Sequence, residues 1–399
     1  MTRLTQPKRR PFVPENLPLP AIDWGTLVPL IGRANRTLAQ YDGMLYGVPN
    51  PAVMLSPMTT QEAVLSSRIE GTQATLGEVL KFEAGEEVKE ESKRQDILEI
   101  INYRKALKVA EERLQARPFS LNLLLELHSI LLNSVRGRDK ARGNFRTQQN
   151  WIGPEGCKIE NAYFIPPEPM SVKACIDNWE KYYHHEEQDP LVQLAIIHAQ
   201  FEIIHPFLDG NGRIGRILIP LFLYEKKLLS RPMFYLSTYL EAHRAEYVQR
   251  LRNLGNPGSW DEWIAFFLRA LSEQAQANSG TVKSILELYG RLKGQIINLT
   301  HSQFAIPLLD ALFDQPIFQS TYLHKREGMP SKPMIMQMLN ALRRHGILKV
   351  VREGSGRRAQ VLALAELVNL CEGRRVIDNA RTGRGAAQRS RASTVISSE

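Results

Sequence analysis

The 399-residue sequence contains three cysteines and no long apolar run. Cys157, Cys175 and Cys371 are unevenly spaced, so they give neither a metal-ligand pattern nor a disulfide framework. So few cysteines indicate a reducing compartment, and we expect a cytoplasmic protein. Because no run of about 18 apolar residues occurs, no membrane-spanning helix is expected. Residues 1–20 are basic and proline-rich without an apolar signal-peptide core, which argues against secretion.

The formal net charge is +9, and most of this excess lies at the two ends of the sequence. Residues 1–20 hold four Lys or Arg and one acid, and residues 373–399 hold six Arg and two acids. The region between the ends is therefore close to neutral. Basic tails explain the charge without a nucleic-acid surface, and we expect residues 374–399 to be a disordered basic tail.

Apolar residues recur at helical spacing through most of residues 58–290, with proline and glycine at the breaks. Only residues 152–167 combine β-prone residues with glycines, which predicts one hairpin. Since the chain exceeds the usual size of one domain, we expect several units in a mainly α fold. These are an N-terminal helical region at 1–115, a helical core at 116–285 and a separate unit at 290–370.

The C-terminal unit is expected to contain three helices and then two extended segments around a glycine turn. The predicted helices lie at 303–313, 319–326 and 331–345, and the extended segments at 347–351 and 360–364. This order resembles a winged helix-turn-helix, with Ser331 capping the third helix. Side chains suited to DNA contacts are expected on that helix and on the wing: Gln337, Asn340, Arg343, Arg344, Arg357 and Arg358. Residues 300–372 carry nine Lys or Arg against six acids, so DNA binding stays open beside protein docking or dimerisation.

The most informative segment is HPFLDGNGRIGR at residues 205–216. It holds a histidine, a carboxylate, a glycine-rich turn and two arginines. The apolar residues 189–204 predict a buried helix, with Asp189 at the N-cap and Pro190 in the first turn. Another helix is predicted at 214–227, so the segment lies between two buried helices. The N-terminus of that second helix suits a phosphate.

Two other interpretations of this segment are disfavoured. Gly210, Gly212 and Gly215 satisfy the GxGxxG pattern of dinucleotide-binding proteins, but that pattern must follow a strand, and here a helix precedes it. His198 could pair with His205 on a metal, but the two positions are about 10 Å apart along the helix axis. We therefore expect His198 to lie in the core.

The HPFxDGNGRxxR pattern closely resembles the signature of the Fic family of protein AMP-transferases, over roughly residues 50–275. The resemblance implies an ATP-dependent enzyme that transfers AMP to a Ser, Thr or Tyr hydroxyl of a target protein or of itself. It also implies Mg²⁺ or Mn²⁺, a Fic-type core, and a homodimer. Two alternatives stay open: removal of AMP, with a water oriented by Glu70, and a DNA-binding regulator whose Fic core acts as a sensor.

The resemblance gives each residue a role. His205 takes the proton of the target hydroxyl, and Asp209 holds Mg²⁺. Arg213 and Arg216 neutralise the phosphates and the departing pyrophosphate. Further ATP contacts are expected from Gly210, Asn211 with its side-chain amide, Gly212, Ile214, Gly215 and Tyr247, with Phe207 in the core. Gly212 stands where phosphate-transferring relatives have lysine, which favours AMP transfer.

Residues 66–71, SSRIEG, resemble the [S/T]xxxE[G/N] motif of the Fic inhibitory helix, here placed near 58–71. Ser66 and Glu70 would share one helix face, which Gly71 could end. Glu70 is expected to make a bidentate contact with Arg216, which withdraws the arginine from the γ-phosphate and makes the bound ATP unproductive.

Residues 143–167 resemble the Fic region that forms a hairpin flap. The flap at 152–167 would hold an extended segment of a target protein by strand addition. Backbone pairing reads little sequence, so the target itself is not predicted.

Overall fold

The computed structural model describes residues 10–133, 140–154, 156–356 and 358–377. These residues are mainly helical, with one three-stranded sheet. No helix among them is both long enough and apolar enough to cross a membrane. Arg357 on the predicted wing and residues 378–399 of the predicted tail lie outside the described residues.

The N-terminal third forms five helices: α1 (Trp24–Tyr46), α2 (Pro51–Met54), α3 (Ser56–Ile69), α4 (Leu76–Glu83) and α5 (Glu91–Ala116). The helix α3 carries the predicted inhibitory motif and is buried along most of its length, between α5 and α10. Glu62 on this helix accepts hydrogen bonds from the backbone N–H and the hydroxyl of Ser237, at 3.0 and 2.6 Å. The motif is therefore part of the packed core.

The central helices are α6 (Leu121–Leu131), α7 (Pro169–Tyr183), α8 (Pro190–Ile204), α9 (Asn211–Glu225), α10 (Ser237–Ala242) and α11 (Arg244–Asn253). Every residue of α8 from Leu191 onward is buried, as expected for a helix that is apolar on all faces. The Asp189 carboxylate caps α8 by accepting from the N–H groups of Leu191 and Val192, at 2.9 and 3.0 Å. The helix α9 begins at Asn211, three residues earlier than predicted, so the glycines open the helix.

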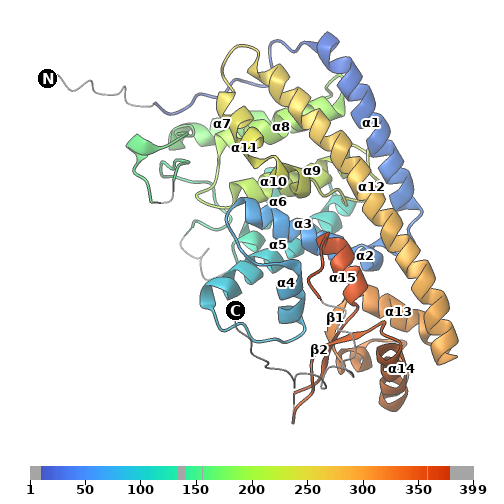
Figure 1. Cartoon of the computed structure of the whole chain (residues 1–399). Coiled ribbons are helices and arrows are strands. Elements are labelled where there is room, and N and C mark those ends of the chain that lie inside the picture. Colours follow the sequence, from blue (N-terminus) through green and yellow to red (C-terminus); the bar gives the residue numbers. More distant parts are fainter. Residues whose placement is uncertain (1–9, 134–139, 155, 357, 378–399) are drawn as a thin grey trace, which may run out of the picture.

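The 42-residue helix α12 (Ser259–Thr300) runs from the central helices into the C-terminal unit. Its first half packs against α1 and α8, and its second half packs against α13, α14 and α15. Figure 1 shows α1 and α12 side by side along one edge of the molecule. The predicted boundary near residue 290 therefore lies inside one continuous helix.

The C-terminal unit contains α13 (Ala305–Asp314), β1 (Ile317–Gln319), the 3₁₀ turn η2 (Tyr322–Lys325), α14 (Lys332–Arg344), β2 (Lys349–Arg352), β3 (Val361–Ala363) and α15 (Ala365–Glu372). The strands form an antiparallel sheet in the order β1-β3-β2. The helix predicted at 319–326 was wrong. Gln319 belongs to β1, because the buried Ile317 and Phe318 pair with β3, and only one 3₁₀ turn follows.

Two local predictions also need correction. The described residues of 152–167, which leave out residue 155, form no regular strands. The isolated bridge between Ile152 and Phe164 encloses the 3₁₀ turn η1 (Ile159–Asn161). The Pro166-Pro167 pair lacks N–H donors, so the ladder cannot extend toward α7. Ser331 stands at the N-cap of α14, but its side chain makes no capping hydrogen bond.

Candidate active site

The loop between α8 and α9 is held by its own side chains. His205 ends α8 in the left-handed conformation, with φ at 50°. The Asn211 amide accepts from the N–H of Phe207 and donates to its carbonyl, both at 2.8 Å. Asn211 therefore shapes the loop. The sequence suggested that its amide contacts an anion, but both ends of the amide are bonded to Phe207. The buried ring of Phe207 lies in the core, where it stacks on His128 with centroids 3.7 Å apart.

His205 is oriented by the end of its own helix. Its Nδ1 lies 3.2 Å from the carbonyl oxygen of Glu202, so Nδ1–H is the donor and Nε2 keeps its lone pair. Burial lowers the pKa of His205 to about 4. The imidazole is therefore neutral near pH 7, which is the form that a general base requires.

The first turn of α9 has the features of an anion site. Gly210, with φ at 80°, occupies the N-cap, and the first N–H groups of a helix have no partners within it. A Cβ atom at Gly212 would collide with Oε1 of Glu70. The Glu70 carboxylate therefore lies directly against Gly212, where a phosphate oxygen would otherwise approach the N–H groups.

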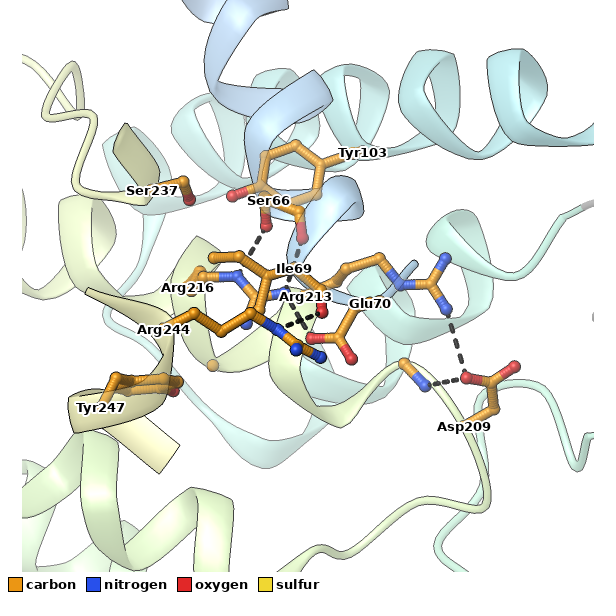
Figure 2. Close-up of polar contacts among 12 residues, drawn as sticks. Ser66, Ile69, Glu70, Tyr103, Asp209, Arg213, Arg216, Ser237, Arg244 and Tyr247 are labelled. Carbon is orange, nitrogen blue, oxygen red and sulfur yellow. Dashed lines mark hydrogen bonds and ion pairs between the residues drawn. The ribbon is translucent and has the colours of Figure 1, made fainter. Parts of the chain in front are cut away.

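Figure 2 shows the hydrogen bonds between the motif at the end of α3 and Arg216 of α9. The Nη2 of Arg216 donates to Glu70 Oε1 at 2.6 Å and to the Ser66 carbonyl at 2.9 Å. The Nε of Arg216 donates to Ser66 Oγ at 2.8 Å. The Glu70 contact uses one oxygen, so the bidentate contact predicted from the sequence was wrong. Ser66 takes the donors that a second carboxylate oxygen would have used.

The charges of this pair are set by burial and by each other. The Arg216 side chain is 1% exposed, and burial alone would lower its pKa, but Glu70 raises it above the ordinary value. Partial burial raises the pKa of Glu70, whose side chain is 38% exposed, but the charge and hydrogen bond of Arg216 outweigh it, so this pKa lies below its ordinary value. Both side chains are therefore charged near neutral pH. Gly71 follows with φ at 106°, a conformation that ends the helix and favours glycine.

Arg213 joins the loop to α5. Its Nη1 donates to Glu99 at 2.8 Å and its Nη2 to Asp209 Oδ1 at 3.2 Å. The same Oδ1 accepts from the N–H of Gly210 at 2.6 Å, while the Asp209 side chain stays 42% exposed. The described residues contain no group of three or more His, Cys, Asp or Glu that could hold a metal. One exposed carboxylate fits Mg²⁺, which often takes one or two carboxylates together with substrate phosphates.

Tyr247 of α11 lines the cavity at the predicted site, but its hydroxyl is hydrogen-bonded to the buried His198. The Nε2 of His198 accepts from the Tyr247 hydroxyl at 3.0 Å, and its Nδ1–H donates to the Gly215 carbonyl at 3.2 Å. Burial lowers the pKa of His198 to about 3, so this histidine is a neutral core residue, as its spacing indicated. The side chain of Ile214 is fully buried and does not line the cavity, and neither does Gly215.

A cavity of about 940 Å³ opens beside His205. Its walls come from the end of α3, residues 151–153 and 163–164, the end of α8, the start of α9, and α11. Arg244 of α11 closes one side by donating to the Ile69 carbonyl at 3.2 Å. Trp151 and Tyr163, which also line the cavity, are 41% and 48% exposed. The cavity thus joins the anion site to an open aromatic edge.

Sequence reasoning missed two residues that hold this site. The buried Arg146 donates from Nε to the His205 carbonyl at 2.9 Å and from Nη2 to the Pro167 carbonyl at 2.5 Å. His128 of α6 accepts from the N–H of Gly143 and donates to the Asp209 carbonyl, both at 3.0 Å. A lone histidine in an apolar helix and an arginine near a predicted flap give no sequence signal for these contacts.

Family comparisons agree with this geometry. Residues 28–112 match the model described as "Fic/DOC family N-terminal", and residues 118–223 match the model described as "Fic/DOC family". These two segments of the chain match the Fic/DOC family. The first match contains the Glu70 motif and the second contains the His205 loop, so the two models cover both halves of the site.

Curated relatives of this chain carry adenylyltransferase names. A probable protein adenylyltransferase of Aquifex aeolicus is 26% identical over 243 residues, which cover 60% of this chain and 66% of the relative. A protein adenylyltransferase Fic of Drosophila grimshawi is 27% identical over 155 residues, covering 38% of this chain and 28% of the relative. The chain thus spans about two thirds of the first relative and about a quarter of the second.

Solved structures share the fold. A Fic family protein from Desulfovibrio desulfuricans G20 has a TM-score of 0.55 at 19% identity, over 89% of this chain and 98% of its own. A Fic domain containing signaling protein from Bacteroides thetaiotaomicron has a TM-score of 0.52 at 17% identity, over 63% and 97%. At these identities the likeness concerns the fold alone.

Proposed function

We propose that this protein transfers AMP from ATP to a hydroxyl of a Ser, Thr or Tyr side chain, on a target protein or on itself, and that Glu70 inhibits the reaction in cis. The observation that carries the proposal is the Glu70 carboxylate at 2.6 Å from Arg216 and against Gly212. A carboxylate held by an arginine at a helix N-terminus marks the place as an anion site. The triphosphate of ATP is the anion that the family names suggest.

In the proposed reaction His205 accepts the hydroxyl proton at Nε2. The hydroxyl oxygen then bonds to the α-phosphorus of ATP, the bond from that phosphorus to the bridging oxygen breaks, and pyrophosphate leaves. Since Nδ1 is held by the Glu202 carbonyl, Nε2 is the nitrogen available for the proton. Arg213 and the N–H groups at the start of α9 stabilise charge on the phosphates.

Asp209 is the residue that would hold Mg²⁺. When bound there, the ion would neutralise phosphate charge as a Lewis acid. The contribution of the chain is the orientation of the carboxylate, because Oδ1 is fixed by Gly210 and Arg213.

The inhibition by Glu70 would act through Arg216. While Glu70 and Ser66 occupy its donors, the guanidinium is not free for the γ-phosphate, and the Glu70 carboxylate repels a triphosphate at the same place. An enzyme with this contact intact is expected to have low activity. The ionised Glu70 could instead orient a water for AMP removal, which is the alternative activity.

The target would dock at residues 152–167, the flap of the sequence prediction. An extended chain across this segment would place its hydroxyl near His205, with Trp151 and Tyr163 available for apolar contacts. Homodimerisation remains part of the proposal, on the family resemblance alone.

For the C-terminal unit we propose a winged-helix domain, supported by the order of α13, α14, β2 and β3 and by the antiparallel sheet. A hollow beside α14 is lined in part by Gln337, Asn340, Arg343, Arg344 and Lys349. These side-chain types contact DNA bases and phosphates, which favours DNA as a second partner. A salt-sensitive, sequence-specific complex with duplex DNA would support this assignment.

The test is transfer of label from α-³²P-ATP to protein with Mg²⁺. Glu70→Gly is expected to raise labelling at least about tenfold, because a charge-assisted contact is worth about 1.5–3 kcal/mol. The double variant Glu70→Gly/His205→Ala should lose the label. Glu87→Gly is the matched control, since Glu87 is an exposed glutamate away from the cavity and its removal should change nothing.

Labelling that rises in the single variant and vanishes in the double variant supports all three parts of the proposal: AMP transfer, inhibition by Glu70, and His205 as the base. If a folded Glu70→Gly protein labels neither itself nor a lysate, the transferase proposal fails. Release of AMP from a modified protein by wild type would then favour the removal activity.

A further inference from the structure

The carboxyl group of Glu202 lines the cavity beside His205 and takes no part in the proposed mechanism. Glu202 occupies the last turn of α8, three residues before His205, and only its main-chain carbonyl contacts the histidine. Its side chain is 9% exposed and lies on the cavity wall with Arg216 and Tyr247. A buried acid in a ligand cavity is costly unless it has a partner.

Glu202 has no such partner in the described chain. Its Oε1 is inaccessible and accepts no hydrogen bond from any described residue. Two polar side chains that line the same cavity have other partners: Arg216 pairs with Glu70 and Ser66, and Tyr247 pairs with His198. Buried polar groups are nearly always satisfied, but Oε1 itself is out of a ligand's reach. A ligand in the cavity can therefore pair only with the other oxygen of this carboxyl.

The chain makes room for this carboxyl. A Cβ atom at Gly215 would collide with Glu202 Oε1, so glycine at this position of α9 leaves the carboxyl its present place. With Oε1 enclosed against Gly215, the other oxygen is left to meet the cavity. The pair is therefore a built feature of the α8–α9 contact.

Charge limits what the acid can bind. Burial raises the pKa of Glu202 to about 8. The positive charge of Arg216 lowers this pKa in part, and the negative charge of Glu70 raises it further. The group is therefore mainly neutral near pH 7 and can both donate and accept a hydrogen bond. The phosphates are served by Arg213, Arg216 and the N–H groups of α9. An uncharged polar group is the partner that fits a neutral acid.

We propose that Glu202 determines nucleotide specificity by hydrogen-bonding an uncharged polar group of the nucleoside portion, either a sugar hydroxyl or the edge of the base. This assignment rests on the proposed nucleotide site. The cavity supports it, since beyond Glu202 it continues along Ile203, Val248 and Leu251, an apolar wall suited to a nucleoside. A residue that acted only through Arg216 would instead affect the phosphates.

The test compares the binding of two probes, ATP and inorganic triphosphate, each with Mg²⁺ at pH 7, by calorimetry. All proteins are full-length and carry Glu70→Gly, so that the anion site is open. Glu202→Leu should weaken ATP binding about tenfold, the value of one hydrogen bond, and leave triphosphate binding unchanged. Glu202→Gln keeps a donor and an acceptor and should bind ATP within about twofold of the parent.

Gly215→Ala gives a second variant in case Glu202→Leu fails to fold, because it displaces the carboxyl without removing it. This variant too should weaken the binding of ATP and leave the binding of triphosphate unchanged. Equal losses for both probes, or ATP affinity unchanged in the leucine variant, would overturn the assignment. If the Glu70→Gly parent binds neither probe, the nucleotide site itself is wrong, a result distinct from the failure of Glu202 alone.

Discussion

Among the attachments of the N-terminal segment to the rest of the molecule are two Glu–Arg pairs that differ in burial. Toward α9, Glu99 meets Arg213 at 2.8 Å, with the side chains 11% and 5% exposed. Toward the C-terminal unit, Glu87 meets Arg358 at 3.4 Å, with the side chains 76% and 67% exposed. Both are Glu–Arg pairs between segments distant in sequence, so the comparison isolates the effect of the surroundings.

The buried attachment can fix the geometry of the candidate site, while the exposed one cannot. A desolvated pair has few alternative partners, and breaking it strands a charge. An exposed pair exchanges freely with water and contributes little. The C-terminal unit is instead attached by apolar packing, since α13 and α15 lie against α2, α3 and α4. Figure 1 shows α15 beside these N-terminal helices.

The largest effect is expected from Glu99→Ala, which leaves the buried guanidinium of Arg213 with Asp209 as its remaining carboxylate. We expect a loss of about 3–5 kcal/mol in the free energy of unfolding, as for other broken buried pairs. Urea denaturation measures it, with Glu99→Gln as the control that keeps the size and one hydrogen bond. A loss below about 1 kcal/mol would mean that burial does not distinguish the two attachments.

An intermediate effect is expected from Gly85→Ala, where α4 meets β1. Gly85 has φ at 80°, and a Cβ atom there would collide with the amide of Gln319. The left-handed conformation costs a non-glycine residue about 1–2 kcal/mol, and the flexible glutamine can move aside. The matched control is Gly294→Ala in the exposed part of α12, which should stabilise by up to about 1 kcal/mol. Equal effects at both glycines would argue against the left-handed conformation at Gly85.

The smallest effect is expected from Glu87→Ala. Removing an exposed partner should change the free energy of unfolding by less than about 1 kcal/mol, and by less still at high salt. A double-mutant cycle with Arg358→Ala measures the coupling directly. A coupling as large as that of Glu99 with Arg213 would erase the difference between the attachments.

The helices of the core could be predicted because their sequences are locally consistent. Residues 189–204 are apolar on every face and start with Asp189 and Pro190, and α8 forms there with the predicted cap. The C-terminal unit was harder to predict. Residues 317–326 contain apolar positions that suit either a helix or a strand. Residues 317–319 form a strand because they pair with β3.

The candidate site was predictable where its residues are close together in sequence. His205, Asp209 and Arg213 lie within one loop and its helix, and that short pattern carried the resemblance to Fic proteins. Asn211 shows the limit of this reasoning. Its residue type suited an anion contact, but the folded loop uses both ends of its amide on Phe207.

The sequence by itself determined the helices, the loop chemistry and the spacing of Ser66 from Glu70, since these depend on neighbouring residues. Only the tertiary structure decided which acid meets which arginine. Glu70 is 146 residues from Arg216, and Glu99 is 114 residues from Arg213. The physical reason is desolvation: an acid acquires a strong partner, or a shifted pKa as at Glu202, only when helix packing removes the water around it.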